Sequence, residues 1–327
     1  MEINLFGCKE TTLYLAKYLK KKNIKINLIT ISAKLAKKNE VAGYLNLNLF
    51  NKIFNKIYIA KSYNLLNQAD EEYFKTKNKS KLGLCCGWQR LIPNKILSKH
   101  KYGVFGMHGS ARNLPLGKGR SPLNWAILED RKFFFTNLFK YNSGVDSGPI
   151  VDTRVFSIQN KDSAETLHYK NMFAMCDLIS ENLKKIFQNN QELIDQKKIS
   201  ESFYPKRTPS DSLIDWKDDI FNIERHIRGV TLPFSGGICF VKKEPIYIYE
   251  ASIFYTDLED HIFVNADFGT VVEVFLNNKF LVRCSGGVLI INKYKSKKNI
   301  IKKNIKFDKS EPSLQRFKRN KYGFFDI

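Results

Sequence analysis

The stretch that decides the fold covers residues 3–31 and reads INLFGCKETTLYLAKYLKKKNIKINLITI. It opens with a short apolar run over residues 3–6, which ends at Gly7. A helical pattern of apolar residues follows over residues 11–22, and a second apolar run covers residues 26–31. A strand, a helix and a second strand in this order predict a parallel sheet with helices packed on it.

Further apolar runs continue this pattern along the first half of the chain. Four of them predict strands, over residues 56–60, 82–86, 102–107 and 133–141, and the pattern over residues 166–187 predicts a long helix. The expected fold of residues 1–190 is therefore α/β, a doubly wound (Rossmann-like) parallel sheet. In such sheets ligands bind beyond the carboxyl ends of the strands.

The second half of the chain has a different pattern. Residues 191–203 are polar and predict a linker, whereas residues 204–295 combine a short helix with several short strands. The expected strands are separated by turn residues and cover residues 238–241, 246–249, 270–275, 279–284 and 288–291. This pattern favours a small β-rich domain, either an OB-like barrel or a sandwich, and residues 296–327 are expected to form a basic tail.

Composition excludes several classes of protein. The chain of 327 residues is 43% hydrophobic, which is typical of a folded protein rather than a disordered one. No apolar run reaches the length of a membrane span, and the first residues lack the basic segment of a signal peptide. The six cysteines are scattered through apolar runs without metal-ligand spacing, so we expect reduced core cysteines, no bound metal and a cytoplasmic location.

The net charge of +22 leaves two interpretations open. Lys and Arg neutralise phosphates, so the excess of 54 basic over 32 acidic residues is compatible with nucleic-acid binding. Only 11 of the basic residues are Arg, however, and the lysines are spread along the whole chain. This distribution favours a solvated surface or a small anionic substrate.

Two glycine-rich loops near the middle of the chain carry a histidine and an aspartate. His108 follows the apolar run over residues 102–107, and Asp146 lies in the sequence SGVDSGPI over residues 143–150. An imidazole exchanges protons near neutral pH, and a carboxylate can orient or charge it. The two residues therefore predict proton-transfer chemistry at one edge of the sheet.

These loops resemble those of the folate-dependent formyltransferases. That family carries a histidine loop, then a Leu-Pro and an Arg-Gly-x-x-Pro stretch, and further on an Asp-x-Gly. The chain matches at His108, Ser110, Leu114, Pro115, Gly119, Pro122, Asp146 and Gly148, and in its second half at Tyr204, Lys206, 214–216, Ile227, Arg228 and 269–271. The resemblance covers roughly residues 1–295 and implies an enzyme that moves a formyl group from 10-formyltetrahydrofolate to a primary amine, with no metal.

The resemblance also implies roles for particular residues. His108 and Asp146 take the catalytic roles, but the family asparagine before the histidine is replaced by Gly106. A substitute donor to the reaction's oxyanion is therefore expected among Asn113, Asn124, Ser110 and backbone N–H groups. The implied folate pocket comprises Cys86, Gly87, Trp88, Gln89, Arg90, Leu91, Ile92, Ser143, Gly144 and Val145, and the candidates for contacting substrate phosphates are Lys118 and Arg120.

Two branches of the family differ in the amine that they formylate. The tRNA branch carries an arginine-rich loop after the second strand, which residues 32–44 lack, whereas residues 122–125 (Pro-Leu-Asn-Trp) resemble the branch that acts on nucleotide-linked amino sugars. We therefore favour a nucleotide-linked amino sugar as the acceptor. Methionyl-tRNA is the alternative acceptor, and a catalytically altered homologue that binds anionic ligands is a third possibility. The sequence does not indicate an oligomeric state.

Overall fold

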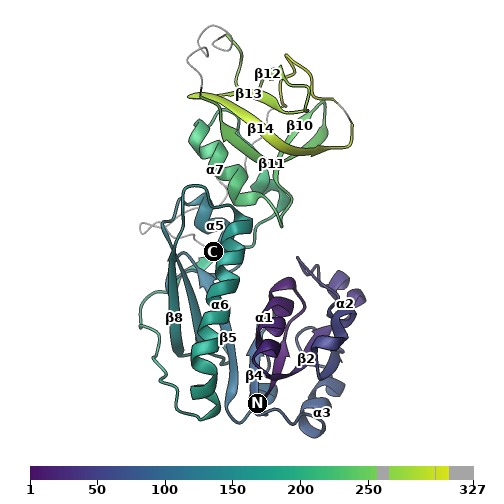
Figure 1. Ribbon diagram of the computed structural model, residues 1–327, viewed down its shortest axis with the longest axis vertical. Coiled ribbons are helices and arrows are strands. Elements are labelled where there is room, and N and C mark those ends of the chain that lie inside the picture. The colour runs from purple at the N-terminus through teal and green to yellow at the C-terminus, as the bar shows by residue number, and fades with distance from the viewer. Residues whose placement is uncertain (256–264, 299, 309–327) are drawn as a thin grey trace. The chain divides into compact units, whose positions relative to one another are not determined.

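The computed structural model describes residues 1–255, 265–298 and 300–308, and the chain divides into two compact units (Figure 1). The N-terminal unit comprises Met1–Lys118, Phe134–Phe156 and Tyr169–Glu201. The C-terminal unit comprises Gly119–Phe133, Ser157–His168 and the chain from Ser202 onwards. Neither unit is one continuous stretch of sequence.

A seven-stranded sheet forms the centre of the N-terminal unit. Its strands, in spatial order, are β3 (Lys56–Ala60), β2 (Lys25–Ile31), β1 (Glu2–Phe6), β4 (Leu82–Cys85), β5 (Gly103–Ser110), β7 (Phe133–Lys140) and β8 (Ile150–Ser157). The first five are parallel, which confirms the expected α/β architecture. The order reverses between β1 and β4, and this reversal is the point where open α/β sheets bind ligands.

β5 is longer than expected, because a neighbouring strand extends it. The parallel pairing of β4 with β5 ends at Cys85 and Gly106. β5 continues to Ser110 because β7 pairs with it antiparallel, with His108 opposite Asn137. His108 therefore lies inside a strand rather than just after one, but still beyond the carboxyl end of β4.

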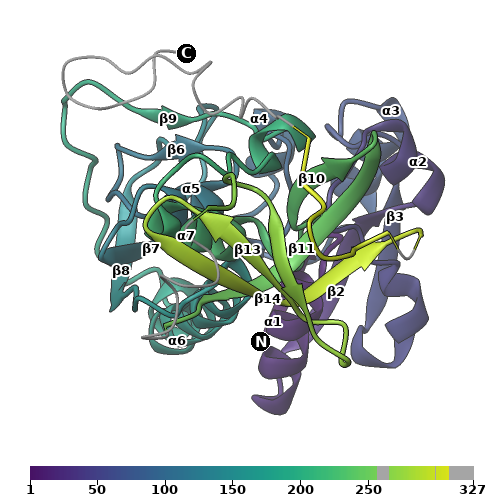
Figure 2. The same cartoon turned by 90° about the horizontal axis from the view of Figure 1, so that it is seen from above.

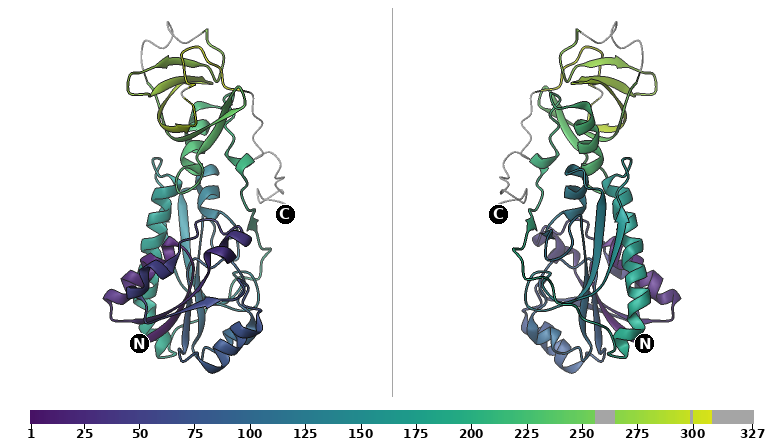
Figure 3. Two further views of the ribbon diagram at one scale, coloured as in Figure 1. Left: turned by 90° about the vertical axis from the view of Figure 1, so that its right-hand side faces the viewer. Right: turned by 90° about the vertical axis from the view of Figure 1, so that its left-hand side faces the viewer.

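Helices cover both faces of this sheet (Figures 2 and 3). The apolar side chains of α1 (Glu10–Lys21) and α6 (Ala164–Phe187) pack on one face, on a core that includes Leu5, Leu28 and Leu84. The opposite face packs Phe6, Ile29 and other side chains against α2 (Ala33–Lys38), α3 (Gln68–Thr76) and α4 (Asn94–Leu97). The long helices match the sequence prediction, whereas α2, α3, α4, β8 and the 3-10 helix η1 (Leu47–Ile53) were not predicted.

The C-terminal unit is built on a five-stranded antiparallel sheet. Its spatial order is β10 (Gly237–Val241), β11 (Glu244–Ile253), β14 (Gly287–Ser296), β13 (Phe280–Cys284) and β12 (Val271–Val274). This confirms the small β-rich domain. The remaining elements are α5 (Pro122–Leu128), α7 (Ile220–Val230), the 3-10 helix η2 (Pro209–Ser212) and the short pair β6 (Lys118–Gly119) and β9 (Phe203–Tyr204).

The first residues of the expected basic tail belong to the core of this unit. Ile301 and Phe307 are buried there, and the Phe307 ring stacks on Trp216 with 5.1 Å between ring centroids. Lys298 and Lys303 form surface ion pairs with Glu244 and Glu273. The basic residues of the tail beyond residue 308 lie outside the described part of the chain.

The six cysteines are all free and buried, as the sequence predicts. In the described ranges of the chain, no helix is long and apolar enough to cross a membrane. The same ranges hold no cluster of three His, Cys, Asp or Glu side chains arranged to hold a metal ion.

His100 makes the stability of the N-terminal unit depend on pH. Its Nε2 accepts a hydrogen bond from Asn4 Nδ2 at 2.8 Å, and its Nδ1 lies 3.1 Å from the carbonyl oxygen of Ile96. Burial lowers the pKa of His100 from 6.5 to about 4, because the charged imidazolium loses solvation. The unfolded chain therefore binds the proton first as the pH falls.

We expect the free energy of unfolding to fall by about 3 kcal/mol as the pH drops from about 6.5 to 4, through this group alone. Urea unfolding at several pH values measures this slope. His100→Gln is expected to be less stable at pH 7.5 but to lose less stability between pH 7 and 5 than the parent protein. Equal slopes for the two proteins would contradict the assignment.

Candidate functional site

His108 is held between two oxygen acceptors. Its Nε2 lies 2.8 Å from the carbonyl oxygen of Gly117, and its Nδ1 lies 3.3 Å from Asp146 Oδ2. The side chain is 9% exposed, and that of Asp146 is 21% exposed. His108 can donate to both oxygens only when it carries two protons. A neutral His108 can therefore donate to only one of these oxygens at a time.

The loop that carries Asp146 is fixed by close backbone contacts. Asp146 has φ of 46°, in the left-handed region that few side chains tolerate. A Cβ atom at Gly148 would lie 1.7 Å from the carbonyl oxygen of Lys140, so only glycine fits there. Gln196 Nε2 donates to the carbonyl oxygens of Asp146 and Gly148, each at 2.8 Å.

Gln196 is a site residue that sequence reasoning missed. It lies in the stretch over residues 191–203 that the sequence predicts to be a linker. The sequence around Gln196 does not mark it as a site residue, because a single Gln in a polar stretch is common. Only the fold brings it to a loop that is 50 residues away in sequence.

Gly106 lies beside Cys85 on the neighbouring strand. A Cβ atom there would lie 2.0 Å from Cε1 and 2.5 Å from the hydroxyl oxygen of Tyr141. The ring of Tyr141 therefore occupies the space that a side chain at position 106 would need. Tyr141 is a second residue that the sequence did not single out.

The three side chains expected to replace the missing asparagine lie in different places. Ser110 is buried two residues beyond His108, and its hydroxyl accepts from the backbone N–H of Arg112 at 3.3 Å. Asn113 is exposed. Asn124 belongs to the C-terminal unit, where its amide nitrogen donates to the Gly229 carbonyl at 2.7 Å and ties α5 to α7.

The segment over residues 86–92 leaves the sheet at the reversal between β1 and β4. Its Trp88 is buried edge-on against Tyr63, with 4.9 Å between ring centroids, and so belongs to the core. Leu91 is 52% exposed, and Val145 in the Asp146 loop is 44% exposed. Within the described chain, the backbone N–H groups of Arg90 and Leu91 make no hydrogen bond. The two loops thus offer exposed apolar side chains beside free backbone donors.

The two expected phosphate contacts are placed differently by the fold. The Lys118 side chain is fully buried in the N-terminal unit, and its Nζ lies 2.5 Å from Glu201 Oε1. This ion pair already neutralises its charge. Arg120 is half-buried in the C-terminal unit, where its backbone N–H donates to the Tyr204 carbonyl.

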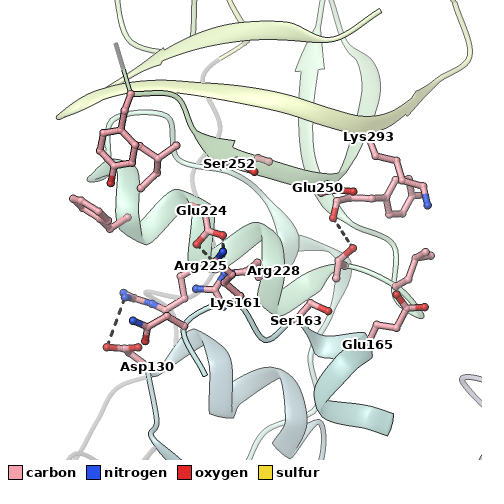
Figure 4. A pocket seen from close by; sticks show the side chains of 18 of the residues that line it. Asp130, Lys161, Ser163, Glu165, Glu224, Arg225, Arg228, Glu250, Ser252 and Lys293 are labelled. Carbon is pink, nitrogen blue, oxygen red and sulfur yellow. Dashed lines mark hydrogen bonds and ion pairs between the residues drawn. The ribbon is translucent and has the colours of Figure 1, made fainter. Parts of the chain in front are cut away.

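A pocket of about 980 Å³ lies within the C-terminal unit, remote in sequence from the His108 loop (Figure 4). Its charged side chains are of both signs. Arg225 faces Asp130 at 4.0 Å, and Arg228 binds Glu224 at 2.7 Å. Because its arginines are paired with carboxylates, the pocket presents no concentrated positive charge.

Comparison with known proteins gives consistent results. The N-terminal model of the family described as formyl transferase matches residues 4–182, and the model of the formyl transferase C-terminal domain matches residues 206–306. The bifunctional polymyxin resistance protein ArnA of Wigglesworthia glossinidia brevipalpis is 31% identical over 166 residues. That match covers 51% of this chain but only 25% of ArnA.

Solved structures share the fold at lower sequence identity. HypX from Aquifex aeolicus has a TM-score of 0.66 at 16% identity, over 91% of this chain and 46% of its own. The N-formyltransferase from Helicobacter canadensis, solved with folinic acid and dTDP-3-aminofucose, has a TM-score of 0.60 at 19% identity. That match covers 90% of this chain and 99% of the Helicobacter enzyme.

Proposed function

This chain belongs to the formyl transferase family, and we propose that it moves the formyl group of 10-formyltetrahydrofolate to the primary amine of a nucleotide-linked amino sugar. The observation that carries the proposal is the 3.3 Å contact between His108 Nδ1 and Asp146 Oδ2 at the carboxyl edge of the sheet. The amine must lose a proton when it attacks the formyl carbon. A histidine beside a carboxylate is suited to accept that proton.

The proposed binding site for the donor is formed by the two loops that follow β4 and β7. Free backbone donors in the segment over residues 86–92 can meet the acceptor atoms of a pterin ring. Leu91 and Val145 offer exposed apolar surface for its aromatic parts. The loops begin next to each other, since Cys85 pairs with Gly106 and the Tyr141 ring lies against Gly106. These features fit a planar ring with polar edges.

Support for the amino-sugar acceptor comes from relatives. The Helicobacter enzyme was solved with an amino-sugar nucleotide, and WlaRD, a sugar 3N-formyl transferase, matches with a TM-score of 0.60 over 92% of this chain and 99% of its own. The sequence over residues 122–125 is a weaker argument here, because Asn124 and Trp125 pack α5 within the C-terminal unit. Methionyl-tRNA stays the alternative acceptor, and a catalytically altered homologue the third possibility.

The test is a screen of amine acceptors with 10-formyltetrahydrofolate, in which release of tetrahydrofolate is measured. We expect turnover with one or more amino-sugar nucleotides. Faster formylation of methionyl-tRNA than of every amino-sugar nucleotide would overturn the choice of acceptor. Folate binding without turnover on any amine would favour the altered homologue.

Salt dependence separates the two acceptors independently. Six or more phosphate contacts to a tRNA lose roughly a thousandfold in affinity between about 50 and 200 mM salt. A nucleotide sugar has two phosphates, so its dependence is expected to be much shallower. Measuring the apparent affinity for each acceptor over this salt range gives the comparison.

Neutralising the basic surface near the chain's end should leave turnover on the sugar nearly unchanged. Lys298 and Lys303 are already paired with carboxylates, so they add little free positive charge. The variant replaces Lys297, Lys298, Lys302 and Lys303 by Gln, and a control with the same change in charge replaces Lys20, Lys21, Lys22 and Lys25. A large loss of activity in the first variant alone would argue for a polyanionic acceptor.

A further inference from the structure

The space beside His108 on β5 is occupied by Tyr141, the residue that follows β7. Residues two apart in a strand point to the same face, so position 106 and His108 share one side of the sheet. Gly106 leaves this position empty, and the Tyr141 ring fills it, with Cε1 2.0 Å and Cζ 2.4 Å from where a Cβ would lie. The hydroxyl oxygen is 2.5 Å from the same point. Tyr141 thus brings a hydroxyl to the face that presents His108.

The position of Tyr141 is fixed by three contacts that do not use its full hydrogen-bonding capacity. Its backbone N–H donates to the Val104 carbonyl at 2.8 Å, and its ring stacks on Phe139 with 5.1 Å between centroids. The Cys85 thiol is a near neighbour of the hydroxyl. Sulfur is a weak acceptor, so a negatively charged oxygen would readily take its place.

We propose that the Tyr141 hydroxyl donates a hydrogen bond to the oxyanion formed during formyl transfer, in the place that Gly106 vacates. This inference rests on the proposed function. When the amine nitrogen forms its bond to the formyl carbon, the π electron pair of the carbonyl moves to oxygen. The pair returns as the bond to the donor nitrogen breaks, and that nitrogen gains a proton as the amine loses one. Tyr141 keeps its own proton throughout.

The surroundings of Tyr141 favour this role over that of a base. Burial raises the pKa of Tyr141 well above its ordinary value, and the neighbouring Cys85 and the charge of Asp146 raise it further. The hydroxyl therefore remains protonated at neutral pH. A neutral donor already in place needs no reorganisation when negative charge develops on the carbonyl oxygen.

Tyr141→Phe is the decisive variant, because it keeps the ring and removes only the hydroxyl. We expect kcat to fall by about a hundredfold or more, with little change in KM for the formyl donor. Tyr58→Phe is the control. It removes a hydroxyl on β3 that donates to Asp70 of α3, and we expect kcat within about threefold of the parent.

Two variants test directly whether Tyr141 supplies the hydrogen-bond donor that Gly106 lacks. Gly106→Asn alone is expected to be nearly inactive, because the Tyr141 ring fills the space. Gly106→Asn combined with Tyr141→Ala places an amide donor in the vacated space and is expected to exceed Tyr141→Ala alone by at least about tenfold in kcat. A purely structural role for Tyr141 predicts no such rescue.

The outcomes separate this inference from the function on which it rests. Turnover by the parent protein together with undiminished kcat in folded Tyr141→Phe overturns the role of Tyr141 and leaves the formyl transfer intact. A parent protein that formylates no amine overturns both. A shifted pH profile of kcat in Tyr141→Phe also overturns the inference, because a donor that keeps its proton does not titrate in that range.

Discussion

His108→Ala and Asp146→Asn are each expected to lower turnover by about a hundredfold or more, the usual contribution of acid–base catalysis. Both side chains are proposed to handle the same proton, since His108 Nδ1 faces Asp146 Oδ2 at 3.3 Å. Removing His108 takes away the imidazole that is proposed to accept the amine proton, and neutralising Asp146 removes the carboxylate charge beside it. Initial rates with saturating formyl donor measure both effects.

The double variant tests whether the two residues act as one unit. We expect His108→Ala combined with Asp146→Asn to be hardly less active than His108→Ala alone, because the second change removes a partner that no longer has a function. Asp267→Asn, which breaks a surface ion pair with Lys306, is a matched control expected to retain activity. Near-normal turnover in either folded single variant would exclude the proton-handling role.

Gly148→Ala is expected to reduce turnover by roughly a hundredfold, although no reacting group is removed. The added Cβ would lie 1.7 Å from the carbonyl oxygen of Lys140, so the loop must shift and carry Asp146 with it. A misplacement of about 1 Å in a catalytic group can cost this much. Turnover and thermal unfolding measured together distinguish a displaced loop from an unfolded protein.

The control for this prediction is the same substitution at an open position. A Cβ atom at Gly43 would have nothing within 4 Å, although the positive φ of Gly43 strains any side chain placed there. Gly43→Ala is therefore expected to show the backbone strain without loss of activity. If Gly148→Ala keeps full turnover, the fit of the loop at Gly148 is not what positions Asp146.

The sequence predicted those strands whose apolar residues are continuous. β2 is almost entirely buried and β3 is apolar along most of its length, and their apolar runs match their bounds closely. β8 was missed because its residues are all partly or largely exposed, so no apolar run marks it. The extra length of β5 could not be predicted from its own sequence either, because it depends on pairing with β7.

The candidate site was predictable only where local sequence fixes it. The glycines around Asp146 mark a tight loop, and the apolar run before His108 marks a strand, so the two residues could be paired from sequence. Tyr141 and Gln196 contact Gly106 and Asp146, which lie 35 and 50 residues away in the sequence. Nothing local distinguishes them from an ordinary strand aromatic and an ordinary polar residue.

The segment over residues 300–308 has a consequence for the order of events during synthesis. Ile301 and Phe307 complete the C-terminal core, and α5 is held there by Gly229 and Tyr204, which follow it by many residues. Domains generally fold as units as they leave the ribosome. Trp125 on α5 is therefore expected to remain unburied during synthesis until the segment that carries Tyr204 and Pro205 has been made.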